Sequence, residues 1–284
     1  MPEKQLKTTT YTPMKRSRDV FSPLQMFRDL RAAGFLGKQL FVRDTKAMFR
    51  QSLLGLIWAF IPPFLTAGAW IFLNFTGAVR INDTGVPYPI YVFCGTILFQ
   101  TFLESMNTPA QSVNAGKSML AKLNFPRESL LINAFYRILF NFGLKFTALM
   151  LITLLLKHQF GWSVLLFPVG VLAAVILGFS IGVFLIPFQM LYTDFTRLLA
   201  ASGQVLLYLT PVVYPIPESG ILYYINRLNP ITYVVQIPRN WFTGQEITHL
   251  GPFLGVCTAS LLLLLLGWVL YRITMPIIIE RVGA

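Results

Sequence analysis

The chain has 284 residues, of which 55% are hydrophobic and only 12% are charged. Because soluble domains carry about 25% charged residues, this composition excludes an ordinary soluble protein and indicates a chain that crosses a membrane several times. The formal net charge is +12, and 11 of the 23 lysines and arginines fall within the first 50 residues. This pattern favours a cytoplasmic surface beside anionic lipid or a protein partner over a nucleic-acid-binding surface.

The N-terminal part of the chain is predicted to form two units. Residues 1–21 are polar and basic, and we expect them to be flexible. Residues 22–52 carry apolar residues at helical spacing between charged ones, which predicts an amphipathic interface helix. Gly34 and Gly37 interrupt this pattern, so a second amphipathic piece is expected to resume near Lys38. Two placements remain open: a helix that lies at the headgroup level, or one whose polar face also docks a soluble partner.

Residues 53–284 are predicted to form an all-α transmembrane domain of six spans. A bilayer core of about 30 Å needs about 20 apolar residues per helix. The fourth apolar stretch is longer than this, so tilt or breaks near Pro168 and Pro187 are expected. The six predicted spans are approximately 53–75, 88–110, 130–156, 162–190, 198–213 and 253–271.

The basic residues between these spans predict the orientation of the chain. Outside the spans, 17 lysines and arginines lie on the side of the N-terminus and 4 lie on the opposite side. The positive-inside rule therefore predicts a multi-pass protein with both termini in the cytoplasm.

The stretch 212–252 is punctuated by prolines and rich in aromatic residues, which concentrate at membrane interfaces. It is long for a structureless connection. We expect a re-entrant pair of short helices that dip into the outer leaflet before the last span, and the alternative is an ordinary extracytoplasmic loop with interfacial anchors.

Polar residues within the spans suggest an intramembrane contact. The third span carries Asn133, Arg137, Asn141 and Lys145 on one helical face, and the second carries Glu104. Measured from the cytoplasmic ends of the predicted spans, Glu104 and Arg137 lie at matching depth, which predicts an ion pair; the alternative is that Arg137 extends to the headgroups. Lys145 has no acid at its depth in the neighbouring predicted spans, and it is either a passage residue or a hydrogen-bonded structural lysine.

No catalytic or metal-binding pattern is present in the sequence. Gly116-Lys117-Ser118 resembles the end of a phosphate-binding loop, but the first glycine of that motif is missing and a membrane helix precedes it. Cys94 and Cys257 fall in apolar runs and are interpreted as packing residues. We therefore expect no metal, no cofactor and no covalent chemistry in this chain.

Four stretches in a fixed order resemble one family. They are RDTKAMFRQSLLGLIWAFIPP (43–63), NAGKSMLAKLNFPRE (114–128), Tyr214-Pro215-Ile216-Pro217 and Leu228-Asn229-Pro230. Together they resemble the integral-membrane permease subunits of ABC exporters of lipid-linked polysaccharide such as O antigen, capsule or teichoic acid. The resemblance covers about residues 24–275.

The resemblance implies a homodimer in the bacterial inner membrane, flanked by two copies of a separate ATPase subunit that carries ATP and Mg²⁺. It places ATPase contacts on the helix before the first span and on a cytoplasmic coupling helix within 111–124. The polysaccharide would pass between the two permease copies, partly along aromatic residues. The residues expected to contact the ATPase are Arg28, Arg31, Arg43, Lys46, Arg50, Asn114, Lys117 and Lys122. The candidates for lining the passage are Trp58, Phe64, Trp70, Asn141, Lys145 and Tyr208.

Two other functions remain open at this point. A sibling permease could export a drug or another small molecule, although such siblings often carry large extracytoplasmic domains. A membrane-embedded lipid-modifying enzyme would need convergent acids, histidines or a nucleophile, and the sequence has none.

Overall fold

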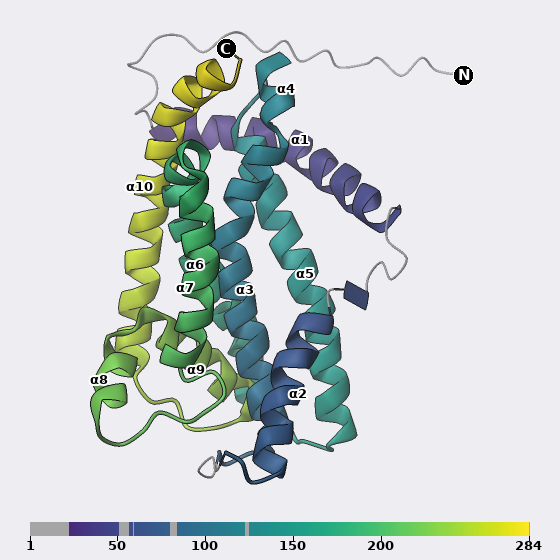
Figure 1. Ribbon diagram of the computed structural model, residues 1–284, viewed down its shortest axis with the longest axis vertical. Helices are drawn as coiled ribbons and strands as arrows, with labels where there is room; N and C mark the ends of the chain where they lie inside the picture. The colour runs from purple at the N-terminus through teal and green to yellow at the C-terminus, as the bar shows by residue number, and fades with distance from the viewer. Residues whose placement is uncertain (1–22, 51–56, 59, 80–83, 123–124, 284) are drawn as a thin grey trace.

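The computed structural model describes residues 23–50, 57–58, 60–79, 84–122 and 125–283, and in these ranges the chain is helical with no strand (Figure 1). The helices are α1 (Pro23–Arg50), α2 (Ile61–Phe75), α3 (Tyr88–Ala115), α4 (Lys117–Lys122), α5 (Glu128–Leu155), η3 (Trp162–Leu166), α6 (Phe167–Leu191), α7 (Thr193–Leu209), α8 (Ile221–Leu228), α9 (Pro230–Thr243) and α10 (Leu250–Gly283). The predicted flexible segment 1–21 and the first residues of the first predicted span lie outside the described residues.

Long helices run side by side along the molecule, and α1 lies across one end of them, near α4 and the end of α10 (Figure 1). Helices α3 and α6 pack in the centre. Gly178 and Gly182 of α6 allow this approach, because a Cβ there would lie 2.4 Å from the carbonyl oxygens of Phe102 and Met106, respectively. Small residues at helix contacts are typical of membrane bundles, in which backbones pack closely.

Three helical segments in the described part of the chain are long and apolar enough to cross a membrane: Glu128–Leu155, Trp162–Leu191 and Leu250–Ile278. Helix α2 is apolar but has only 15 residues, fewer than the roughly 20 that a span needs. The protein is thus a multi-pass, all-helical membrane protein, and the count of six spans stays a prediction.

The predicted interruption of the N-terminal helix is wrong. Helix α1 runs through Gly34 and Gly37 without a break. A Cβ at Gly37 would lie 2.6 Å from Ile132 Cγ2 and 2.9 Å from the Ser129 carbonyl, whereas a Cβ at Gly34 would meet nothing within 4 Å. Gly37 therefore allows α1 to pack closely on α5, and this requirement looks the same in the sequence as a helix break.

The long connection before the last helix contains two short helices, α8 and α9, as expected. Asn229 is the N-cap of α9, since its side-chain oxygen accepts a hydrogen bond from the Ile231 backbone N–H, and Pro230 follows at the first helical position. All residues of α9 except Pro230 and Gln236 are buried. Entry of these helices into the outer leaflet stays a prediction.

Several helix boundaries differ from the predicted spans. Helix α3 continues five residues beyond the predicted end, to Ala115, and α10 continues to Gly283. The expected change near Pro168 is present, because the 3-10 helix η3 gives way to α6 at Phe167. Of the predicted tilt or breaks, a break near Pro187 is wrong, since α6 contains this proline and ends at Leu191, and tilt stays a prediction.

Candidate functional site

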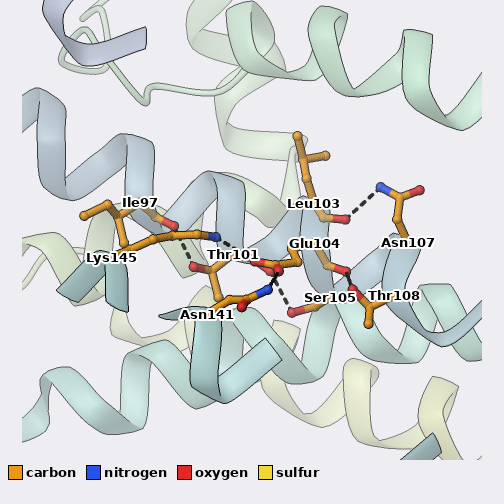
Figure 2. A network of polar contacts seen from close by, with 9 residues as sticks. All are labelled: Ile97, Thr101, Leu103, Glu104, Ser105, Asn107, Thr108, Asn141 and Lys145. Carbon is orange, nitrogen blue, oxygen red and sulfur yellow. Dashed lines mark hydrogen bonds and ion pairs between the residues drawn. The ribbon is translucent and has the colours of Figure 1, made fainter. Parts of the chain in front are cut away.

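The first polar cluster joins α3 to α5 within the membrane-spanning part of the bundle. Lys145 Nζ donates to Glu104 Oε2 over 2.6 Å, and Asn141 Nδ2 donates to Glu104 Oε1 (Figure 2). The Lys145 side chain is 8% exposed and that of Glu104 is 21% exposed. In a low-dielectric environment either charge alone would be costly, so each stabilises the other in its ionised form.

This geometry corrects the predicted pair between Glu104 and Arg137. Because α3 extends five residues past the predicted end of its span, Glu104 lies about 7.5 Å farther from the end of its helix than predicted. One further turn along α5 from Arg137 is Asn141, and the next is Lys145, so Glu104 meets these two instead. Lys145 therefore does have an acidic partner on the neighbouring helix. Arg137 is half-buried and has no ion pair within the described residues.

The hydroxyl groups of α3 around Glu104 are satisfied within the helix. Thr101 donates to the Ile97 carbonyl, Ser105 to that of Thr101, and Thr108 to that of Glu104, each over 2.7 Å (Figure 2). Such bonds to the residue four positions earlier remove the need for an outside partner. The Glu104 carboxylate is consequently the polar group by which this part of α3 reaches α5.

A second polar cluster fastens α1 and α5 to α10 at the end of the bundle where α4 lies. Arg272 of α10 is buried, and its guanidinium contacts Asp29 of α1 and lies 3.1 Å from Glu128 Oε1 of α5. The Tyr271 hydroxyl donates to the Arg127 carbonyl over 2.9 Å. The sequence placed Arg272 only at the end of a span, because its acidic partners are far away along the chain.

A further contact holds the other half of α1. Asn133 Nδ2 of α5 donates to Asp44 Oδ2 over 2.9 Å. Arg43 pairs with Asp44 over 2.7 Å and approaches Met119 Sδ of α4 at 3.1 Å. Helix α1 is thus bound to α5 and to α4 through these side chains. From the sequence, Arg43 was expected to contact an ATPase, and Asp44 had no predicted role.

The basic residues expected to meet an ATPase lie at this same end of the molecule (Figure 1). The cations of α1 are exposed, Asn114 is exposed and Lys117 is half-buried. The side chain of Lys122 lies outside the described residues. These cations are Arg28, Arg31, Arg43, Lys46 and Arg50, and Lys38 of the same helix is exposed as well. Their contact with an ATPase stays a prediction.

The aromatic candidates for a passage lie on α2, on the short turn before it and on α7. The rings of Trp70 and Tyr208 lie 6.5 Å apart at 60°, which brings α2 to α7. Phe64 packs edge-on against Phe93 of α3 with ring centroids 4.9 Å apart, and Trp58 is exposed. A passage along these residues stays a prediction.

Arg239 of α9 is a buried cation in the stretch predicted to form re-entrant helices, and the sequence predicted no partner for it. It is 1% exposed, and its Nη1 donates to the carbonyls of Pro211 over 3.0 Å and Val212 over 2.9 Å. Its guanidinium lies 3.7 Å from the centroid of the Tyr91 ring. These carbonyls follow the C-terminus of α7, where the helix dipole is negative, so dipole and aromatic face together stabilise the buried charge. Arg239 anchors the segment after α7 against α3.

Candidate ligands for a metal do not gather in the described part of the chain, where no group of three or more His, Cys, Asp or Glu could hold an ion. Both cysteines are free thiols; Cys94 is buried and Cys257 is half-buried. The polar groups described above serve to join helices, and the arrangement is that of a membrane subunit whose parts are linked through buried charges.

Comparison with known proteins gives the family. Residues 36–243 match the ABC-2 type transporter family, and the chain belongs to it. Its members are membrane permeases, so this protein is a transport subunit without catalytic activity, and ATP is bound by a separate ATPase subunit.

Two relatives are named O-antigen export system permease protein RfbA. The one from Myxococcus xanthus is 24% identical over 244 residues, which cover 85% of this chain and 93% of the relative. One from Klebsiella pneumoniae is 23% identical over 221 residues, which cover 73% of this chain and 80% of the relative. The resemblance to an ABC exporter permease found in the sequence is thereby confirmed.

Proposed function

We propose that this protein is the permease subunit of an ATP-driven exporter that moves a lipid-linked polysaccharide from the cytoplasmic side across the bacterial inner membrane. The observation that carries this proposal is the similarity to O-antigen export permeases along nearly their whole length. The polar clusters support it, because they link helices in the way a subunit driven from outside requires.

The proposed topology has six spans with both termini in the cytoplasm. Helix α2 belongs to the first span, and α3, α5, η3 with α6, α7 and α10 belong to the others. The excess of basic residues on the side of the N-terminus supports this orientation. So does the position of α1, α4 and the end of α10 together at one end of the bundle (Figure 1).

Two copies of the chain enclose the passage in this proposal, and an ATPase subunit docks on α1 and α4 of each copy. The contacts Asp44–Asn133 and Gly37–Ile132 join α1 to α5. The Glu104 cluster then joins α5 to α3. A displacement of α1 by the ATPase is therefore passed to α5 and from α5 to the centre of the membrane.

Deletion of the gene in its host tests the function directly. We expect the surface polysaccharide to disappear, measured by gel electrophoresis and staining of surface glycan, and the wild-type gene to restore it. A deletion strain that displays its glycan normally, or one that loses resistance to a small molecule instead, contradicts the proposal.

Charge reversal tests the docking surface. Arg43, Lys46 and Arg50 replaced together by Glu should leave the protein inserted in the membrane but abolish copurification of the ATPase encoded beside it. The matched control reverses Lys157 and Arg227, exposed cations assigned to the opposite side of the membrane. If ATPase binding and export survive reversal on α1, this helix is an anchor and not a docking surface.

A further inference from the structure

Helix α3 has an unusual pattern of exposure. From Ile90 to Val113 every residue is buried except Gln100, Leu103, Glu104, Asn107 and Gln111. Four of these five are polar, and their spacing of three and four residues places them on one face of the helix. We call Gln100, Glu104, Asn107 and Gln111 the polar stripe. The apolar surface of α3 is covered by the bundle, while the polar stripe remains partly exposed.

The position of the polar stripe makes this exposure significant. Gln100 and Gln111 are separated by a rise of about 16 Å, roughly half of a hydrocarbon core of about 30 Å. The stripe runs from the middle of α3 toward the end that carries α4 (Figure 1). Gln100, Glu104 and Asn107 lie within the predicted span 88–110, and Gln111 lies one residue beyond it. Polar groups within a span do not face lipid, because the loss of hydration is costly; they face protein or water.

The hydrogen-bonding state of the stripe indicates which ligand it suits. Lys145 balances the charge of Glu104, so the stripe has no net charge that would trap an ion. Asn107 donates its amide hydrogen to the Leu103 carbonyl over 2.8 Å, and its side-chain oxygen is left as an acceptor. The amides of Gln100 and Gln111 make no hydrogen bond within the described residues. Amide groups both donate and accept, as sugar hydroxyl groups do.

Helix α7 lies beside the stripe. Gly203 of α7 packs beside it, since a Cβ there would lie 3.3 Å from Leu103 Cδ2. Farther toward the opposite end, Trp70 and Tyr208 bring α2 and α7 together. The stripe thus has α5 on one side, through Lys145, and on the other side α7, which carries the aromatic candidate Tyr208.

We propose that the polar stripe is a carbohydrate-binding track on the wall of the passage, where amide side chains exchange hydrogen bonds with successive hydroxyl groups of the glycan. The track replaces the hydration that the hydroxyl groups lose on entry, and as a neutral surface it lets the chain slide. This inference rests on the proposed function and assigns one face of α3 to substrate contact.

Accessibility of the stripe to water is tested with single cysteines in membranes that hold the full chain, after Cys94 and Cys257 are replaced by Ala. Gln100→Cys should react with a charged, water-soluble thiol reagent at least about tenfold faster than two controls. Gln111→Cys, just beyond the predicted span and exposed, shows the rate at a site open to water. The controls are Thr108→Cys, buried on the same helix, and Leu262→Cys, exposed on the apolar surface of α10. Reaction of Gln100→Cys as slow as that of the controls, or spontaneous cross-linking to a second copy in place of labelling, overturns the track.

Contact with carbohydrate is tested by export in the complemented deletion strain. Gln100→Leu combined with Gln111→Leu replaces two amide side chains by apolar side chains of similar size. We expect the rate of glycan appearance at the surface to fall about tenfold, which corresponds to the loss of two modest hydrogen bonds. Gln100→Asn should restore much of the rate lost on Gln100→Leu. Gln159→Leu, in an exposed loop, is the matched control.

The outcomes separate the two proposals. If the wild-type gene restores the glycan and the double variant, present at the same level in the membrane, exports at the wild-type rate, the track is wrong while the proposed function stands. If the wild-type gene restores no glycan, the proposed function fails and the track with it. Slower export in the double variant together with rapid labelling of Gln100→Cys supports the track.

Discussion

Loss of one partner from the Glu104–Lys145 pair should destabilise the protein far more than loss of both. Lys145→Met leaves the Glu104 carboxylate with Asn141 alone, and Glu104→Gln leaves the Lys145 ammonium without its counter-charge. The matched control is Arg137→Gln on the same face of α5, because Arg137 has no ion pair among the described residues.

The size of the effect follows from the burial of the pair. Removal of one partner from a fully buried ion pair costs about 3–5 kcal/mol. With Glu104 21% exposed and still bonded to Asn141, we expect the low end, about 3 kcal/mol. At roughly 2–4 °C per kcal/mol this lowers Tm by roughly 6–12 °C. The double variant Glu104→Gln with Lys145→Met contains neither charge, and its free energy of unfolding should lie within about 1 kcal/mol of the wild type.

Thermal unfolding in detergent, followed by tryptophan fluorescence at fixed detergent and salt concentrations, measures these differences. Wild type, the two single variants, the double variant and Arg137→Gln form a complete set. The reasoning is refuted if the single variants unfold at the wild-type temperature, or if the double variant loses as much as the two single losses added together.

Two further predictions concern packing and charge where α1 meets the bundle. Gly37→Ala should destabilise the protein by about 1–3 kcal/mol, because the new methyl group has no room against α5. Gly34→Ala, in open space, should be neutral or stabilise by up to about 1 kcal/mol, and equal Tm values for the two variants contradict the packing argument. Arg272→Met should cost about 3–5 kcal/mol and expose α1 to added protease, since it leaves two acids without their shared cation, and Arg272→Lys should cost less; unchanged proteolysis in Arg272→Met contradicts the role of this cluster.

The class of the fold was accessible from the sequence because a membrane constrains composition and the length of apolar stretches. The two short helices before α10 were also predictable, since Asn229 followed by Pro230 is a helix start that acts locally. The packing role of the glycines was not predictable from the sequence. Gly37 permits close packing on α5, but in the sequence it looks the same as a helix break. The residue that requires a glycine there, Ile132, lies 95 positions farther along the chain.

The candidate site was predictable in its members but not in its pairing. Glu104, Asn141 and Lys145 were all singled out, yet the partner of Glu104 was misassigned because the end of α3 was placed five residues too early. An error of that size in a helix boundary shifts depth by about 7.5 Å, which exceeds one helical turn. Arg239 could not be found at all, because its acceptors are backbone carbonyls, which every residue has.

The Glu104–Lys145 pair also bears on how the protein is made. The two residues are separated by 41 positions, so at about 5–20 residues per second the carboxyl group is synthesised roughly 2–8 s before the lysine that balances it. An unbalanced charge at the middle of a helix opposes its release into lipid by about 2.5–3.5 kcal/mol. Helix α3 is not among the three strongly apolar segments, whereas α5 is. We therefore expect α3 to wait beside the insertion machinery until α5 arrives, so that the two helices enter the bilayer as one neutral hairpin.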